Sequence, residues 1–202
     1  SKIDIFLNPV EIPSEIPIRT DETLVKIIFL GRIGHRKGSF DVIKAFAKAM
    51  PHFSCPVILQ MAGDGEIEKA KQLVKSFQLE DQIHLLGWIG QDQRNQVLSE
   101  SNIFVLPSYN EGLPLSLLEA MSWGLPVITS PVGGIPEVIE HNKNGILCTP
   151  GDVNTLSESL INLVEDKAYR TRLGAQARKC IQAFSAYDYC LQMQSLYQRS
   201  VN

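Results

Sequence analysis

Short apolar runs, rich in β-branched residues, alternate with longer segments of helical periodicity along most of the 202-residue chain. This alternation constrains the fold most, because unbroken apolar runs are typical of strands buried on both faces of a parallel sheet. We expect an α/β protein with a Rossmann-like, doubly wound parallel sheet of about six strands and helices on both faces. The expected strands are 25–30, 57–62, 83–86, 103–106, 126–130 and 145–148. The expected helices are 39–50, 65–78, 92–100, 114–123 and 134–140, with two or three more after residue 152.

The composition excludes several classes of function. A net charge of −3 gives no basic footprint for nucleic acid. No apolar run approaches the ~18 residues of a membrane-spanning helix. The four cysteines lack C-x-x-C spacing, which favours a reduced, cytoplasmic setting over a disulfide framework.

Three prolines between residues 8 and 22 predict an interdomain linker over residues 1–22, ahead of the first strand. The Rossmann-like domain is expected over residues 23–183. Because the chain begins at Ser1 without an initiator methionine, we expect it to be a piece of a longer protein.

Glycines and polar residues collect directly after the expected strands. The segments GRIGHRKGS, AGDGE, GWIGQ, PSYNEGLP and SPVGGIPE follow the first five strands in turn. The carboxyl ends of parallel strands share one edge of the sheet, where ligands of such folds bind. The sequence therefore predicts the functional site at this edge.

The first of these segments has the composition of an anion site. Gly31 gives flexibility, positive charge comes from Arg32, Arg36 and Lys37, and the next helix offers free N–H groups. The pattern is neither a P-loop nor G-x-G-x-x-G, so it predicts neither an ATPase nor a dehydrogenase. A solvated basic turn is the alternative interpretation.

No Asp-x-Asp motif and no zinc-type spacing of His, Cys and Asp occurs in the sequence. A pyrophosphate at this edge would then be neutralised by Arg32, Lys37 and helix amides rather than by a metal ion. We therefore expect no metal and no other cofactor.

Glu111 and Glu119 lie eight residues apart in NEGLPLSLLEAMSWG. Pro114 suits the first turn of a helix, which puts Glu111 in the preceding loop and Glu119 in the second turn. Eight helical residues rise about 12 Å, whereas the two carboxylates of a glycosidase stand ~5–9.5 Å apart. We therefore disfavour a glycosidase and expect the carboxylates to bind opposite ends of one ligand, two sugar rings joined by a phosphate bridge.

The backbone amides between these glutamates are expected at a helix N-terminus, where they would meet that phosphate. They belong to Gly112, Leu113 and Leu115. For Glu119 the alternative is an ordinary surface glutamate of an amphipathic helix. Trp88 also has two interpretations, an apolar platform beside a flat base or a packing residue.

Several motifs occur in the order found in one enzyme family: GR…RKG, LQMAGDGE, IHLLGW, LPSYNEGLPLSLLEAMSWGLPVITSPVGGIPEVI and NGIL. With them the chain resembles the C-terminal, donor-binding half of a GT-B glycosyltransferase of the large retaining family four (glycosyl transferases group 1). The resemblance extends from about Asn8 to the last helix, 184–202, which is similar to that family's closing helix.

The resemblance implies roles for individual residues. Arg32 and Lys37, beside Gly31, would hold the pyrophosphate of a nucleotide sugar. Glu111 would face the hydroxyls of the donor sugar, and Glu119 would face the ribose. The turn at Trp88 would lie by the base. The amides near the phosphate and sugar would be those of Gly112, Leu113 and Leu115, and the catalytic residues would be Arg32, Lys37 and Glu111.

The resemblance further implies a metal-independent, retaining glycosyltransferase that moves a hexose from a UDP- or GDP-sugar to a polysaccharide, lipid or other glycan acceptor. We expect the family's N-terminal acceptor domain to be absent from this chain, which would then be nearly inactive alone. In the family, peripheral association with the cytoplasmic membrane face is common. Pro114 departs from the glycine of many relatives and removes one backbone donor.

Two alternatives remain open. The first is another enzyme of the same fold, either a nucleotide-sugar epimerase or a phosphorylase. The second is a non-catalytic module that binds nucleotide sugars.

Overall fold

The structure is a computed structural model that describes residues 9–17 and 23–201. Residues 1–8 and 18–22 of the predicted linker, and Asn202, lie outside the described residues, and the domain boundaries stay predictions. The strands are β1 (Val25–Leu30), β2 (Val57–Ala62), β3 (Ile83–Gly87), β4 (Ile103–Leu106), β5 (Val127–Thr129) and β6 (Ile146–Leu147). The α-helices are α1 (Ser39–Ala49), α2 (Ile67–Ser76), α3 (Gln91–Glu100), α4 (Leu115–Ser122), α5 (Val153–Glu165), α6 (Lys167–Ile181) and α7 (Ala186–Val201). The single 3-10 turns are η1 (His35–Lys37), η2 (Met50–His52), η3 (Ile135–Glu137) and η4 (Gln182–Phe184).

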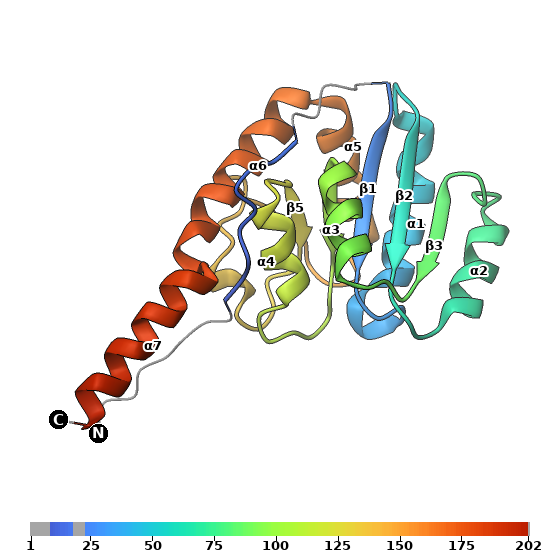
Figure 1. The fold of residues 1–202 in the computed structure, drawn as a ribbon. Helices are drawn as coiled ribbons and strands as arrows, with labels where there is room; N and C mark the ends of the chain where they lie inside the picture. The colour runs from blue at the N-terminus through green and yellow to red at the C-terminus, as the bar shows by residue number, and fades with distance from the viewer. Residues whose placement is uncertain (1–8, 18–22, 202) are drawn as a thin grey trace.

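All six strands form one parallel sheet in the order β3-β2-β1-β4-β5-β6 (Figure 1). The expected Rossmann-like, doubly wound fold is confirmed, and β1, β2 and β4 have the predicted bounds. Helices α3 and α4 cover the face turned toward the viewer, and α1 and α5 lie behind the sheet (Figure 1). The chain order reverses between β1 and β4, so the topological switch point lies where these two neighbouring strands end.

The central strands are apolar because helices cover both of their faces. Every residue of β4 is fully buried, and Phe29 of β1 and Phe46 of α1 are buried with it. Burial of apolar surface on both faces is the main stabilising term of such a layer. This burial holds β1 and β4 in the middle of the domain, together with the starts of the two loops that follow these strands.

One expected helix is wrong. Within residues 134–140 only the single turn η3 forms. Pro136 favours the start of a helix, but the side chain of Asn144 then takes over the backbone groups that would continue it. Its Oδ1 accepts from the Glu140 N–H (2.7 Å), and its amide donates to the carbonyl of Val138 (2.8 Å).

The described part of the predicted linker runs beside α4 and α6 (Figure 1). The N–H of Val10 donates to the carbonyl of Phe184 (2.9 Å), and Arg178 donates to the carbonyls of Pro13 and Ser122. Helix α7 then extends away from the sheet (Figure 1). Across the described ranges, none of the helices has the length and apolar character needed to cross a membrane.

We expect Gly174→Ala to destabilise the protein, although alanine normally favours a helix over glycine by about 1 kcal/mol. A Cβ at Gly174 of α6 would stand 2.2 Å from the carbonyl oxygen of Gly124, which follows α4. Helix α6 would have to move away from α4, and overpacking of this kind costs about 1–3 kcal/mol. Urea denaturation gives the free energy of unfolding directly.

The matched control is Gly90→Ala, because Gly90 has a φ of −76° and no atom within 4 Å of an added Cβ. Gly90 is the N-cap of α3, where alanine is less favourable than glycine, so the free energy of unfolding should fall by only about 0.5 kcal/mol. Equal stability of the two variants would contradict the close contact of α6 with Gly124.

Candidate functional site

The two loops at the switch point lie against each other. The loop after β1 spans residues 31–38, and the loop after β4 spans residues 107–114. Gly38 permits their closest approach, since its φ is +69° and a Cβ there would stand 2.2 Å from the carbonyl oxygen of Pro107. Further along, the N–H of Tyr109 donates to the carbonyl of Arg36 (2.9 Å). The cationic loop is therefore held beside the loop that contains Glu111.

Arg32 and Lys37 line one pocket of about 430 Å³, together with Gly65 and Glu66 from the turn after β2. A backbone hydrogen bond from Ile33 to the carbonyl of Asp64 (2.6 Å) attaches the loop to that turn. Three cations, Arg32, Arg36 and Lys37, outnumber the one carboxylate of the pocket, Glu66, and the pocket lies next to the start of α1. This environment suits an anion. In the parts of the chain that the structure describes, no three His, Cys, Asp or Glu side chains come close enough to hold a metal ion.

Lys37 and Glu111 form an ion pair with an Nζ–Oε1 distance of 2.5 Å. Their side chains are only 15% and 6% exposed, so each charge needs its partner. The fully buried Ser108 donates its hydroxyl to the same Oε1 (2.7 Å). Among the described residues, Oε2 of Glu111 has no hydrogen-bond partner. One oxygen is thus fixed, and the other can accept a hydrogen bond from a ligand.

Tyr109 ties both loops to α1. Its hydroxyl donates to Oδ2 of Asp41 (2.7 Å), and its ring stacks on His35 with centroids 4.2 Å apart. The hydrogen bond to Asp41, followed by burial and the charge of Asp41, raises the pKa of Tyr109 to about 12. Tyr109 therefore stays a neutral hydrogen-bond donor through the physiological pH range, and its hydrogen bond to Asp41 is kept.

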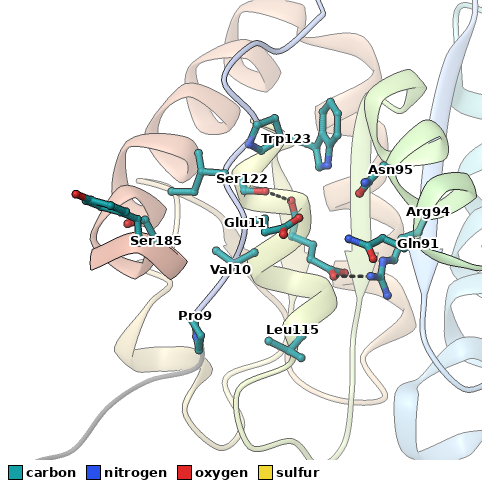
Figure 2. Close-up of a pocket in the computed structure, with 14 residues that line it drawn as sticks. Pro9, Val10, Glu11, Gln91, Arg94, Asn95, Leu115, Ser122, Trp123 and Ser185 are labelled. Atoms are coloured by element: carbon teal, nitrogen blue, oxygen red, sulfur yellow. Dashed lines mark hydrogen bonds and ion pairs between the residues drawn. The ribbon is translucent and has the colours of Figure 1, made fainter. Parts of the chain in front are cut away.

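Glu119 lies in the second turn of α4 and faces a groove of about 690 Å³. Figure 2 shows the groove between α3, α4 and residues 9–13. Arg94 of α3 binds Glu119, with 3.1 Å between Nη2 and Oε1. Burial raises the pKa of Glu119, the charge of Arg94 opposes that rise, and the charge of Glu11 adds to it.

The structure places the predicted residues around two pockets. Arg32 and Lys37 line the first, where Lys37 pairs with Glu111. Leu115 and Glu119 line the groove. Trp88 lines neither and is 77% exposed.

The loop between the two glutamates connects these pockets. The N–H of Gly134 donates to the carbonyl of Gly112 (2.7 Å). The turn at Gly133 and Gly134, after β5, therefore holds this loop in place. Helix α4 begins at Leu115, one residue later than predicted, with Pro114 as an N-cap that makes no side-chain cap. Its first turn therefore keeps backbone N–H groups that no side chain caps.

Sequence reasoning missed three side chains of the site. Ser108 and Tyr109 lie three and two residues before Glu111, but the bond of Ser108 to Glu111 depends on the fold of this loop, and that of Tyr109 to Asp41 depends on its contact with α1. Arg94 is far from Glu119 in sequence, and only the packing of α3 beside α4 brings the two together. The one available signal was an arginine in the first turn of a helix, where acidic residues are the rule.

Comparison with known proteins identifies the family. The family described as Glycosyl transferases group 1 matches residues 14–180. The N-acetyl-alpha-D-glucosaminyl L-malate synthase of Bacillus anthracis is 36% identical over 159 residues, which cover 78% of this chain and 41% of that protein. The chain spans less than half of the length of curated relatives that it matches, 41% of the synthase and 37% of the amylovoran biosynthesis glycosyltransferase AmsK of Erwinia amylovora.

Solved structures share the fold. Sucrose-phosphate synthase from Thermosynechococcus elongatus has a TM-score of 0.81 at 26% identity, over 96% of this chain and 51% of that one. The C-terminal domain of a group 1 glycosyl transferase from Francisella tularensis has a TM-score of 0.72 at 25% identity, over 79% of this chain and 85% of that one. Anabaena HepE, solved with UDP and glucose, has a TM-score of 0.78 at 23% identity over 88% of this chain and 49% of that one. With its motifs, its sheet order and these matches, the chain belongs to the glycosyl transferases group 1 family.

Proposed function

We propose that this chain is the donor-binding part of a metal-independent, retaining glycosyltransferase. The observation that carries the proposal is the buried Lys37–Glu111 pair at the switch point, beside Arg32 and the start of α4. It combines positive charge for a diphosphate with a carboxylate oxygen for sugar hydroxyls. The fold neighbour HepE was solved with UDP and glucose, which supports a nucleotide-sugar donor.

In this proposal the donor extends from one pocket to the other. Arg32 and Lys37 neutralise the diphosphate, with the amides of Gly112, Leu113 and Leu115 on its other side. Oε2 of Glu111 accepts hydrogen bonds from the hexose hydroxyls. Glu119 accepts hydrogen bonds from the ribose, and the exposed Trp88 lies by the base.

Catalysis would rest on electrostatic stabilisation of the leaving group. The bond between the anomeric carbon and the phosphate oxygen breaks, and the nucleoside diphosphate that leaves carries the new charge toward Arg32 and Lys37. The acceptor hydroxyl forms the new bond and its proton leaves with the diphosphate. Lys37 and Ser108 both hold Oε1 of Glu111 in place, which favours a role of this carboxylate as a ligand of the sugar rather than as a nucleophile.

The acceptor would be a polysaccharide, a lipid-linked sugar or another glycan, bound by a part of the full-length protein outside this chain, at the cytoplasmic membrane face. A relative supports this acceptor class, since the amylovoran biosynthesis glycosyltransferase AmsK of Erwinia amylovora is 34% identical over 151 residues. The hexose would come from a UDP- or GDP-sugar.

Titration of the chain with UDP, GDP and ADP by calorimetry should give saturable binding of one nucleotide. Binding should be the same with EDTA and with added MgCl₂, because Arg32 and Lys37 supply the positive charge that a metal would otherwise supply. Binding that disappears in EDTA and returns with MgCl₂ would contradict metal independence. No binding of any of the three at millimolar concentration would contradict a preformed donor site.

Lys37→Ala and Arg32→Ala should each weaken binding of the selected nucleoside diphosphate about ten- to hundredfold, the usual value of one hydrogen bond to a charged group. Lys71→Ala is the matched control, since Lys71 pairs with Glu68 at the surface, with 58% and 79% exposure, and the variant should bind like wild type. Lys37→Ala also leaves Glu111 without its partner, so a thermal melt must accompany each titration. Wild-type affinity in a folded Lys37→Ala variant would refute the assignment of Lys37 to the diphosphate.

A further inference from the structure

We propose that Arg94 is a positioning residue for the nucleoside: it fixes one oxygen of Glu119 so that the other oxygen accepts the ribose hydroxyls. This inference rests on the proposed function, in which Glu119 binds the ribose. It adds a residue that neither the motifs nor the resemblance singles out.

Arg94 contacts one of the two carboxylate oxygens of Glu119. Arg94 lies in the first turn of α3, where its N–H donates to the carbonyl of Gly90 (2.9 Å), and it points across the groove to α4 (Figure 2). Its Nη2 lies 3.1 Å from Oε1 of Glu119. Within the described residues, Oε2 of Glu119 has no hydrogen-bond partner. The carboxylate is therefore held by one oxygen and open at the other.

The charges around Glu119 also favour a role for Arg94. Two charged groups act on Glu119, Arg94 from α3 and Glu11 from residues 9–13. The phenol of Tyr187 of α7 lines the same groove. Burial and the charge of Glu11 both raise the pKa of Glu119, and Arg94 is the group that lowers it. Without Arg94, the carboxyl would take up a proton at higher pH and lose an acceptor position for the ribose.

The guanidinium of Arg94 also has a donor that Glu119 does not satisfy. Nε of Arg94 is buried and has no hydrogen-bond partner among the described residues. A buried donor without an acceptor is unfavourable, so Glu119 alone does not satisfy all the donors of this guanidinium. The groove thus already contains a donor and an acceptor side by side, which is the complement of a sugar hydroxyl.

The competing explanation is an ion pair that only joins α3 to α4. The two side chains are 35% and 21% exposed, and pairs of that kind often contribute little stability. A structural pair would affect all ligands alike, whereas a positioning pair affects only ligands that carry the ribose hydroxyls. Ligands that differ by one hydroxyl separate the two explanations.

The experiment measures, by calorimetry, the affinity of the chain for UDP, 2′-deoxy-UDP and 3′-deoxy-UDP, or for the GDP set if GDP is the nucleotide bound. Wild type should prefer the ribonucleotide over at least one deoxy form about tenfold or more, as expected for a hydroxyl bound to a carboxylate. Arg94→Met should lower that preference to less than about threefold, and Arg94→Lys should restore part of it because a single charge remains. The control Arg172→Met alters an arginine that stacks on Tyr169 of α6, outside the groove, and should keep the full preference.

Glu119→Ala separates failure of this inference from failure of the proposed function. If Glu119→Ala loses the preference while Arg94→Met keeps it, the role of Arg94 is refuted and the ribose role of Glu119 stands. If Glu119→Ala keeps the preference, or wild type has none, the ribose role itself is refuted and the inference falls with it. Equal weakening of all three ligands by both Arg94 variants, with the preference intact, would show a structural pair and refute the proposal.

A pH series gives a second readout. Glu119 accepts the hydroxyl above its pKa and loses the bond as the pH falls through that value. Because Arg94 lowers this pKa, the preference for the ribonucleotide should disappear at a higher pH in Arg94→Met than in wild type. Identical pH profiles would refute the electrostatic part of the proposal.

Discussion

The contact between the loops after β1 and β4 is the constraint on which the rest of the site depends. These strands are neighbours in the middle of the sheet, although 72 residues separate the end of β1 from the start of β4. Their loops approach so closely at Gly38 and Pro107 that a side chain at residue 38 would collide with backbone. This approach brings Lys37 to Glu111 and Tyr109 to Asp41. A cation and a carboxylate from distant parts of the sequence thereby share one buried environment.

Glu111 and Glu119 are held in the same way. In each, Oε1 is bound by a protein cation, and Oε2 has no partner among the described residues. The cation prevents an isolated buried charge, while the second oxygen keeps the capacity to accept a hydrogen bond. The difference lies in exposure, because the Lys37–Glu111 pair is more deeply buried than the Arg94–Glu119 pair. The two sites therefore use the same chemistry at different depths in the protein.

Most of the fold could be predicted because buried strands and helices require recognisable patterns of apolar residues. Residues 25–30, 57–62 and 103–106 are apolar without interruption, and a strand covered on both faces requires that pattern. The helix expected over 134–140 is only the turn at 135–137, because the side chain of Asn144, several residues later, takes the backbone groups that would continue it. The site loops could be located for the same reason as the strands, because they follow them. Ser108, Tyr109 and Arg94 could not, because their partners are set by the packing of loops and helices rather than by local sequence.

The two pockets are attached to parts of the fold with different resistance to local opening. The first is anchored on β1 and β4, whose backbone amides lie in the centre of the sheet and should exchange with solvent only when the whole domain unfolds. The groove has residues 9–13 as one wall, and single contacts such as those of Val10 with Phe184 and Arg178 with Pro13 hold that wall in place. Loss of a few such bonds would open the groove while the sheet stays intact. A ligand spanning both pockets would thus meet a rigid surface at one end and an adaptable one at the other.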